Sequence, residues 1–174
     1  MNNEVLQNIR TRRSCRAYTA QQVEPEKLKA ILEAGTWAAS GHGWQAAKIV
    51  VLQDAAEIPE PERMNAAVLG NPDGHPFYGA PVVCVVLADP ERYTCVEDGS
   101  LVMGNLMLAA HSLGVASCWI HRAREEFDSP EGKALLKKWG VDERYIGVGH
   151  CILGYAANEA PAPKPRKNDY VIYR

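Results

Sequence analysis

The chain has 174 residues, the length of one domain, and its 47% hydrophobic and 23% charged residues exclude a mostly disordered protein. No apolar run approaches the roughly 20 residues that a membrane-spanning helix needs. Residues 1–4 also lack the basic-then-apolar order of a signal peptide, so we expect a cytoplasmic protein that does not bind membranes.

Positive charge is concentrated at the two ends of the chain. Residues 1–18 and residues 164–174 each carry four basic and one acidic side chain, and the overall charge of −2 leaves −8 for the residues between them. This distribution disfavours a broad nucleic-acid surface, which would need a basic face. We therefore expect no nucleic-acid partner and a small anionic ligand held by the two ends.

The first half of the chain predicts two helices and then a strand. The spacing of apolar residues predicts helices over residues 4–12 and 23–35, the second with proline and acids in its first turn and a glycine at its end. A short β-rich run follows at 48–52. Residues 53–67 are expected to be partly helical, and 71–76 form a loop rich in turn residues.

The second half predicts three strands and two further helices. The continuous apolar run at 80–88 is typical of a central strand that is covered on both faces. Residues 96–113 predict a helix that is apolar nearly all round, and therefore buried in a core or at a subunit interface. Strands are predicted at 115–120 and 145–153, with an amphipathic helix at 130–139 between them.

This order of elements predicts an α+β fold in which helices cover a central sheet. No repeat or linker divides the sequence, so residues 1–174 are expected to form one domain. Residues 156–174 are expected to form an extended C-terminal arm, because its first part is rich in proline and alanine and has no periodicity.

Four arginines occur within seven positions near the N-terminus. If this segment is extended, Arg12, Ser14 and Arg16 point the same way, because alternate residues share a face. Two guanidinium groups beside a hydroxyl suit a phosphate dianion. Arg13 and Cys15 would point the other way. A solvated basic terminus, or arginines paired with acidic neighbours, is the alternative interpretation.

The C-terminal arm repeats this pattern on a smaller scale. Proline keeps the stretch around Lys164 and Arg166 extended, so these two side chains share a face. They could contribute to the same anion site, or they could belong to a solvated charged tail.

Five patterns, in a fixed order, resemble the FMN-dependent nitroreductase family. Residues 12–18 are similar to that family's Arg-x-Ser-x-Arg/Lys-x-aromatic opening, and residues 31–45 to its helix and following Ala-Pro-Ser-x-x-Asn-x-Gln-Pro-Trp loop. Residues 78–83 are similar to the family's entry to a central strand, and residues 98–120 to its long dimer helix with the strand after it. Residues 152–166 are similar to its Gly-Tyr strand end followed by a basic tail.

The resemblance implies a three-layer α+β sandwich with a mostly antiparallel sheet flanked by helices. It also implies an intertwined homodimer with FMN at the subunit interface. The cofactor-binding residues that it implies are Arg12, Arg13, Ser14, Arg16, Ser40, Gly41, Gln45, Cys118, Trp119, Ile120, Lys164 and Arg166.

The resemblance also assigns these residues to three parts of the flavin. Arg12, Ser14 and Arg16 would bind the phosphate, helped by Lys164 and Arg166 from the arm. Arg16 would also stabilise the N1–O2 edge of the reduced ring. Ser40, Gly41 and Gln45 would reach the flavin of the partner subunit. Residues 118–120 would line the ring with backbone donors and apolar surface.

The implied function is an FMN-dependent oxidoreductase that takes electrons from NADH or NADPH. A ping-pong cycle would pass them to a nitroaromatic, a quinone or an enone. Flavin carries this chemistry, so the protein supplies binding and orientation, and no catalytic residue is assigned. The alternative is a non-enzymatic FMN-binding or storage protein, or a family member poor in flavin.

Three departures from the family pattern lie in the loop before the first strand. Gly43 replaces the family's asparagine, Ala46 and Ala47 replace its Pro-Trp, and Ala39 replaces a proline. We therefore expect a more flexible loop that lacks one polar contact near the ring. The chain is short for the family, and residues 65–76 are the expected substitute for a lid.

The sequence also contains residues for two other kinds of site. Cys118, His121, His150 and Cys151 include zinc-binding residue types, but neighbouring side chains on a strand face opposite sides, so a shared metal site is not expected. Cys15 lies among arginines that could lower its pKa and make it a nucleophile, although a bystander role is favoured. The odd number of cysteines, five, does not predict a disulfide framework.

Overall fold

The computed structural model describes residues 2–174. Its helices are α1 (Glu4–Thr11), α2 (Pro25–Thr36), α3 (Pro59–Val68), α4 (Cys95–Ser112), α5 (Ala123–Asp128) and α6 (Pro130–Lys138). Its strands are β1 (Ala47–Leu52), β2 (Val82–Ala88), β3 (Ala116–Ile120) and β4 (Ile146–Gly154), and a short 3₁₀ helix, η1, spans Gly41–Gly43. The predicted helices and strands are all present, whereas α5 and η1 were not predicted.

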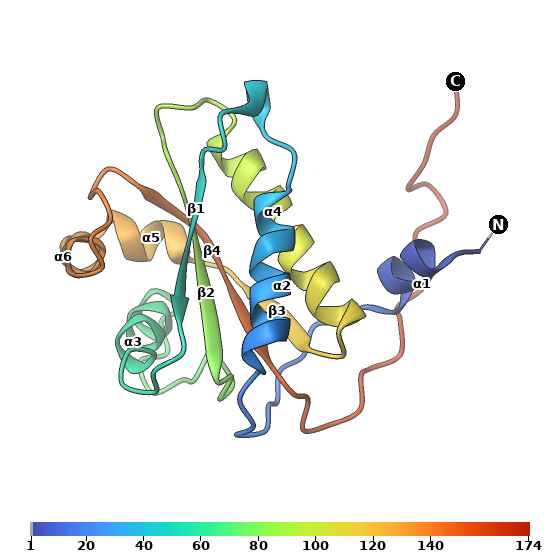
Figure 1. Ribbon diagram of the computed structural model, residues 1–174, viewed down its shortest axis with the longest axis horizontal. Helices are drawn as coiled ribbons and strands as arrows, with labels where there is room; N and C mark the ends of the chain where they lie inside the picture. Colours follow the sequence, from blue (N-terminus) through green and yellow to red (C-terminus); the bar gives the residue numbers. More distant parts are fainter. Residues whose placement is uncertain (1) are drawn as a thin grey trace.

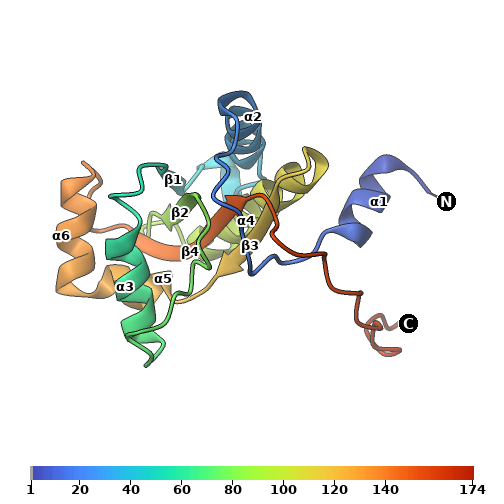
Figure 2. The ribbon, with the colours of Figure 1, turned by 90° about the horizontal axis from the view of Figure 1, so that it is seen from below.

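The strands form a four-stranded sheet in the order β1-β2-β4-β3, and every pairing is antiparallel. Helices cover both faces of this sheet (Figures 1 and 2). The predicted α+β sandwich is therefore confirmed. Because β2 and β4 lie in the centre, β1 and β3 are the two edges of the sheet.

The sheet separates two hydrophobic cores, and the side chains along each central strand point alternately into one and the other. On β2, Val86 belongs to the cluster that includes residues of α2 and α4, whereas Val85 belongs to the cluster that includes residues of α3, α5 and α6. All seven residues of β2 are buried, as its continuous apolar sequence predicted.

Helices α2 and α4 approach each other closely at a glycine. A Cβ atom on Gly35 would lie 2.8 Å from the Cδ2 of Leu106, so a larger residue would require this buried side chain to move. Asn105 strengthens the contact by donating from Nδ2 to the carbonyl of Ala34 at 2.9 Å. Gly35 was predicted to end its helix, but α2 continues to Thr36, and the glycine serves close packing.

Helix α4 is buried on one side and exposed on another. Met103 and Leu106 are fully buried, whereas Leu101 and Val96 keep 49% and 46% of their surface exposed. The apolar sequence of this helix thus exceeds what the core of one chain covers, which suits a helix at a subunit interface. Over residues 2–174, no helix combines the length and apolarity needed to cross a bilayer.

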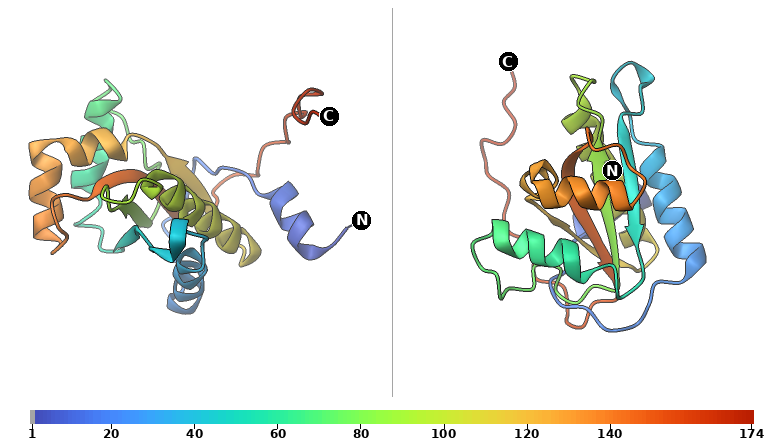
Figure 3. Two further views of the ribbon diagram at one scale, coloured as in Figure 1. Left: turned by 90° about the horizontal axis from the view of Figure 1, so that it is seen from above. Right: turned by 90° about the vertical axis from the view of Figure 1, so that its left-hand side faces the viewer.

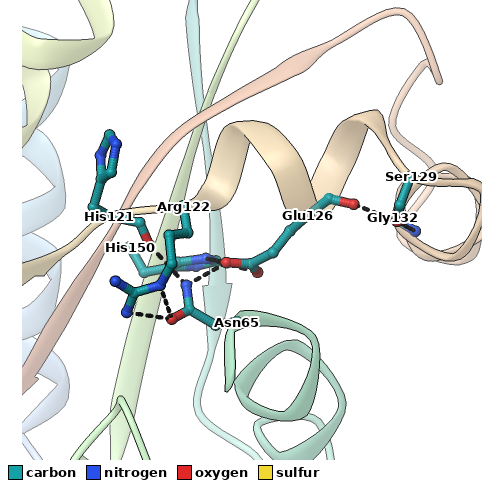
Figure 4. A network of polar contacts seen from close by, with 7 residues as sticks. All are labelled: Asn65, His121, Arg122, Glu126, Ser129, Gly132 and His150. Carbon is teal, nitrogen blue, oxygen red and sulfur yellow. Dashed lines mark hydrogen bonds and ion pairs between the residues drawn. The ribbon is translucent and has the colours of Figure 1, made fainter. Parts of the chain in front are cut away.

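A buried polar network holds α5 against α3 and β4 (Figure 4). The side-chain oxygen of Asn65 accepts hydrogen bonds from the Arg122 Nε and Nη2 at 3.0 and 2.8 Å. Its amide nitrogen donates to the His121 carbonyl at 2.7 Å and to the carboxylate of Glu126. Both oxygens of that carboxylate lie 3.0 Å from Nε2 of His150.

This network explains a helix that hydrophobic patterning does not reveal. Glu126 and His150 are 1% and 0% exposed, so each polar group depends on the other for its partner. Arg122, just before α5, has a left-handed φ of 80°, and its two bonds to Asn65 hold it in this uncommon conformation.

Both ends of the chain project from the same side of the molecule (Figures 1 and 3). None of the eight residues of α1 is buried. The C-terminal arm begins beside the N-terminal segment, because the amide of Ala157 donates to the carbonyl of Ala17 at 2.9 Å. Residues 156–174 are all exposed.

Candidate flavin site

The arginine-rich segment after α1 is extended and lies along the outer edge of β3. Ser14 forms a parallel bridge with Ser117, and the amide of Cys15 donates to the carbonyl of Ser117 at 2.9 Å. The segment therefore pairs with β3 through one bridge, and its extended backbone is the conformation from which the sequence predicted alternating side chains.

Arg12, Ser14 and Arg16 gather near the thiol of Cys118. Burial raises the pKa of this thiol, while Arg16, Ser14 and Arg12 act in the opposite direction. The Nη1 atom of Arg12 is buried and has no hydrogen-bond partner within residues 2–174. An unpaired, buried guanidinium nitrogen is costly unless an anion or water satisfies it. The donor set therefore fits a bound phosphate.

Arg13 has a different set of contacts. Its Nη1 donates to the carbonyls of Arg10 and Arg12, each at 2.7 Å. A cation at these last carbonyls of α1 suits the negative end of the helix. Arg13 therefore has structural partners, although its side chain also lines the cavity described next.

A cavity of about 500 Å³ lies beside the arginine-rich segment. Its lining comes from this segment, from the end of α4 and the turn before β3, and from the start of the arm; it includes Arg13, Ser14, Cys15, Arg16, His111 and Glu159. Arg12 is not among the lining residues, whereas Arg13 and Cys15, which were predicted to point the other way, are. We call this space the anion cavity. His111 was not singled out by sequence reasoning, because a lone histidine at the end of an apolar helix carries no motif.

The open edge of β3 continues this site beyond the basic residues. The carbonyl of Ser117 points outward to Cys15, so the backbone of Trp119, two residues on, faces the same edge. The side chains of Cys118 and Ile120 are buried in the core. The indole of Trp119 lies over Gly149, where a Cβ atom would come within 2.4 Å of its Nε1. Residues 118–120 thus offer mainly backbone to a ligand.

Lys164 and Arg166 lie farther along the arm, and both are exposed. The arm starts next to the arginine-rich segment, so the two basic ends do share one side of the molecule (Figure 3). Residues 158–161 line the anion cavity, but Lys164 and Arg166 are not among the residues that line it.

Ser40, Gly41 and Gln45 lie elsewhere, in the loop before β1, at the other edge of the sheet (Figure 1). The amide of Gly41 donates to Oδ1 of the buried Asp98 at 3.0 Å, and the amide of Gln45 donates to Oγ of Ser40 at 3.1 Å. One chain therefore does not bring these residues together with the arginine-rich segment.

The shape of this loop depends on left-handed residues and on stacked rings. His42 and Gln45 have φ values of 53° and 52°. The ring of His42 stacks on Trp44 at 4.6 Å and lies 2.8 Å from the hydroxyl of Tyr93. These contacts join the loop to residues just before α4, in a part of the chain where the sequence predicted extra flexibility.

An apolar groove of about 1010 Å³ runs between α2 and β1 next to this loop. Leu28 and Leu32 of α2 and Ile49 and Val51 of β1 contribute to its lining. Asp98 also lines it and is 3% exposed; its Oδ2 is buried without a hydrogen-bond partner in the described chain. The groove follows the open edge of the sheet.

The other sequence expectations concern a lid, a metal site and a nucleophile. Asn65 cannot belong to a lid, because it lies in α3 and is wholly buried in the network of Figure 4. Across residues 2–174, no three metal-ligating side chains gather, and His150 and Cys151 face different cores. The Cys15 thiol donates to the carbonyl of Ala17 at 3.1 Å.

The model of the nitroreductase family matches residues 9–155 of this chain. The chain belongs to the nitroreductase family. The match includes the arginine-rich segment, both edges of the sheet and all of the predicted site except the two basic residues of the arm.

Individual relatives agree with this assignment. A crystal structure of a nitroreductase from Bacteroides fragilis with bound FMN is 32% identical, has a TM-score of 0.91, and is matched over 99% of this chain and 100% of that one. A nitroreductase from Desulfitobacterium hafniense with bound FMN is 30% identical, with a TM-score of 0.90 and full coverage of both chains. A relative from Archaeoglobus fulgidus, provisionally named NADH dehydrogenase/NAD(P)H nitroreductase, is 32% identical over 90% of this chain and 87% of its own length.

Proposed function

We propose that this nitroreductase binds FMN along the β3 edge and uses NADH or NADPH to reduce nitroaromatic, quinone or enone acceptors. The observation that carries the proposal is the extended segment 12–16 on that edge, with the buried, unpaired Nη1 of Arg12. The FMN-bound solved relatives, which match over nearly the whole chain, support the choice of cofactor.

The residues of this chain would bind and orient the cofactor. Arg12, Ser14 and Arg16 would hold the phosphate through charge-assisted hydrogen bonds, with Lys164 and Arg166 joining from the arm. The outward-facing backbone of Trp119 would offer donor and acceptor groups to the ring. Bound FMN would supply the hydride chemistry, receiving electrons from the nicotinamide and then passing them to the acceptor in a ping-pong cycle.

The active form is proposed to be a homodimer. Ser40, Gly41 and Gln45 lie at the β1 edge, so they would complete a flavin site only in a partner subunit. Exposed apolar surface supports this arrangement, since Leu101 and Val96 of α4 are uncovered and the groove beside β1 is open. The arm carries further exposed apolar residues, Val171 and Ile172, which could occupy the groove of the other subunit.

The first experiment is flavin retention. Purified protein is incubated with excess FMN, desalted, and examined by absorbance in the flavin band. We expect about one FMN per chain, bleached by anaerobic titration with NADH or NADPH and restored by an acceptor. Protein that retains no flavin would contradict the proposal. Retained flavin that neither nicotinamide reduces would favour a storage role.

A further inference from the structure

His111 connects the end of α4 to the arginine-rich segment. Its ring Nε2 lies 2.8 Å from the hydroxyl of Thr11, which is the last residue of α1. The ring also lines the anion cavity together with Ser14 and Arg16. His111 is half-buried, and its ring forms part of the cavity wall that a bound ligand would contact.

The hydrogen bonds of Thr11 favour one tautomer of a neutral His111. The Thr11 hydroxyl donates to the carbonyl of Gln7 at 2.8 Å, so its oxygen is left to accept from His111. Nε2 is then the protonated nitrogen and Nδ1 the free one. When Nδ1 also takes a proton, the ring becomes a cation with one N–H to spare for an anion.

The charges around His111 are mostly positive. Burial, then Arg12 and then Arg13 lower the pKa of this imidazole below its usual range. Arg16 lines the same cavity, and Glu159 from the arm is the acidic group there. Glu159 is thus the exception among the charged groups that face His111 from α1, the arginine-rich segment and the arm. The others are cations, and they favour the neutral form of His111 until an anion binds.

We propose that His111 is a further phosphate-binding residue of this protein, which takes up a proton when the dianion of FMN enters the anion cavity. The inference rests on the proposed function. It adds a fourth side chain, from the end of α4, to the three donors that the arginine-rich segment supplies. Unlike the arginines, this donor is charged only when its ligand is present.

Proton uptake makes a specific prediction about pH. A dianion offsets the repulsion from Arg12 and Arg13, so the pKa of His111 rises on binding, and FMN must bind more tightly as the pH falls. The useful window is pH 8 to about 6.5, because the phosphate itself begins to take up a proton near pH 6. Uptake of one proton changes affinity by at most about tenfold per pH unit.

The test compares FMN with riboflavin, which has the same ring and no phosphate. Dissociation constants are measured from flavin fluorescence with the full chain, freed of bound flavin by dialysis. For the wild type, we expect FMN affinity to improve about fivefold to tenfold from pH 8 to 6.5, and riboflavin affinity to stay constant. His111→Gln should remove most of this improvement and weaken FMN about fivefold at pH 6.5. His75→Gln, a change at an exposed histidine outside the cavity, should behave like the wild type.

The outcomes separate this inference from the proposed function. Failure of the wild type to bind FMN would defeat the proposed function itself. Normal FMN binding with no pH dependence, or an equal loss of FMN and riboflavin in His111→Gln, would overturn only the role of His111. If that variant unfolds, the comparison of the two flavins in the wild type still decides the matter.

Discussion

The two edges of the sheet differ in what they offer a ligand. The β3 edge is occupied by residues 12–16, which add cations and an unpaired guanidinium nitrogen. The β1 edge borders an apolar groove and the loop that carries Ser40, Gly41 and Gln45. Residues that form one predicted cofactor site along the sequence are thus divided between two surfaces, and the proposed homodimer would unite them.

The separation of the two edges depends on a rigid sheet between them. The pair of Glu126 and His150 helps to keep this sheet rigid. Glu126→Ala should destabilise the protein by about 3–5 kcal/mol, because it leaves a buried histidine without its partner. Urea unfolding measures this change. Glu125→Ala, at an exposed position in the same helix, should change stability by less than about 0.5 kcal/mol. Similar effects of the two variants would refute a structural role for the network.

The β3 edge can be disabled on its own. Arg12→Ala removes one charged partner of the phosphate, which is worth about 1.5–3 kcal/mol, or roughly tenfold to a hundredfold in the dissociation constant of FMN. Fluorescence titration measures this constant. Cys15→Ala removes an uncharged thiol that donates to the carbonyl of Ala17, and should leave affinity within about twofold of wild type. Retention of wild-type FMN affinity by Arg12→Ala would place the phosphate elsewhere.

Disturbing the contacts proposed at the β1 edge should weaken the dimer. Val171→Asp combined with Ile172→Asp puts charge on the exposed apolar part of the arm, and we expect the dimer dissociation constant to rise by about tenfold or more. Sedimentation equilibrium measures this constant. Val68→Asp introduces one such charge on α3, at a residue that is 41% exposed, and should leave assembly unchanged. A dimer of normal strength in the double variant would mean that the arm does not occupy the groove.

Much of the fold could be predicted from the sequence because local patterns determine it. Strand β2 is a continuous apolar run, and α4 is a long apolar helix, so both were identifiable. Helix α5 was missed because it has only six residues and buries a glutamate in addition to Ala123 and Phe127. The partner of that glutamate, His150, is 24 residues away, and no spacing rule links the two.

The candidate site was predictable to a different degree at each edge. The alternation in residues 12–16 grouped Arg12, Ser14 and Arg16, and all three act on Cys118. The anion cavity, however, is lined by Arg13 and Cys15 as well as by Ser14 and Arg16, and Arg12 is not among its lining residues. His111 joined the cavity only through the fold, which brings the ends of α1 and α4 together. The roles of Lys164 and Arg166 stay predictions, because the local pattern does not determine where an exposed arm lies.

The burial of the other cysteines leaves one accessible thiol to which a reporter dye can be attached. Across residues 2–174, Cys15 is the one cysteine that is not buried, and burial raises the pKa of the Cys84 thiol to about 12. A maleimide dye at neutral pH would therefore label Cys15 selectively. Because Cys15 lines the anion cavity, a dye attached there would compete with the phosphate of FMN, and protection of Cys15 from labelling would report occupancy of the site.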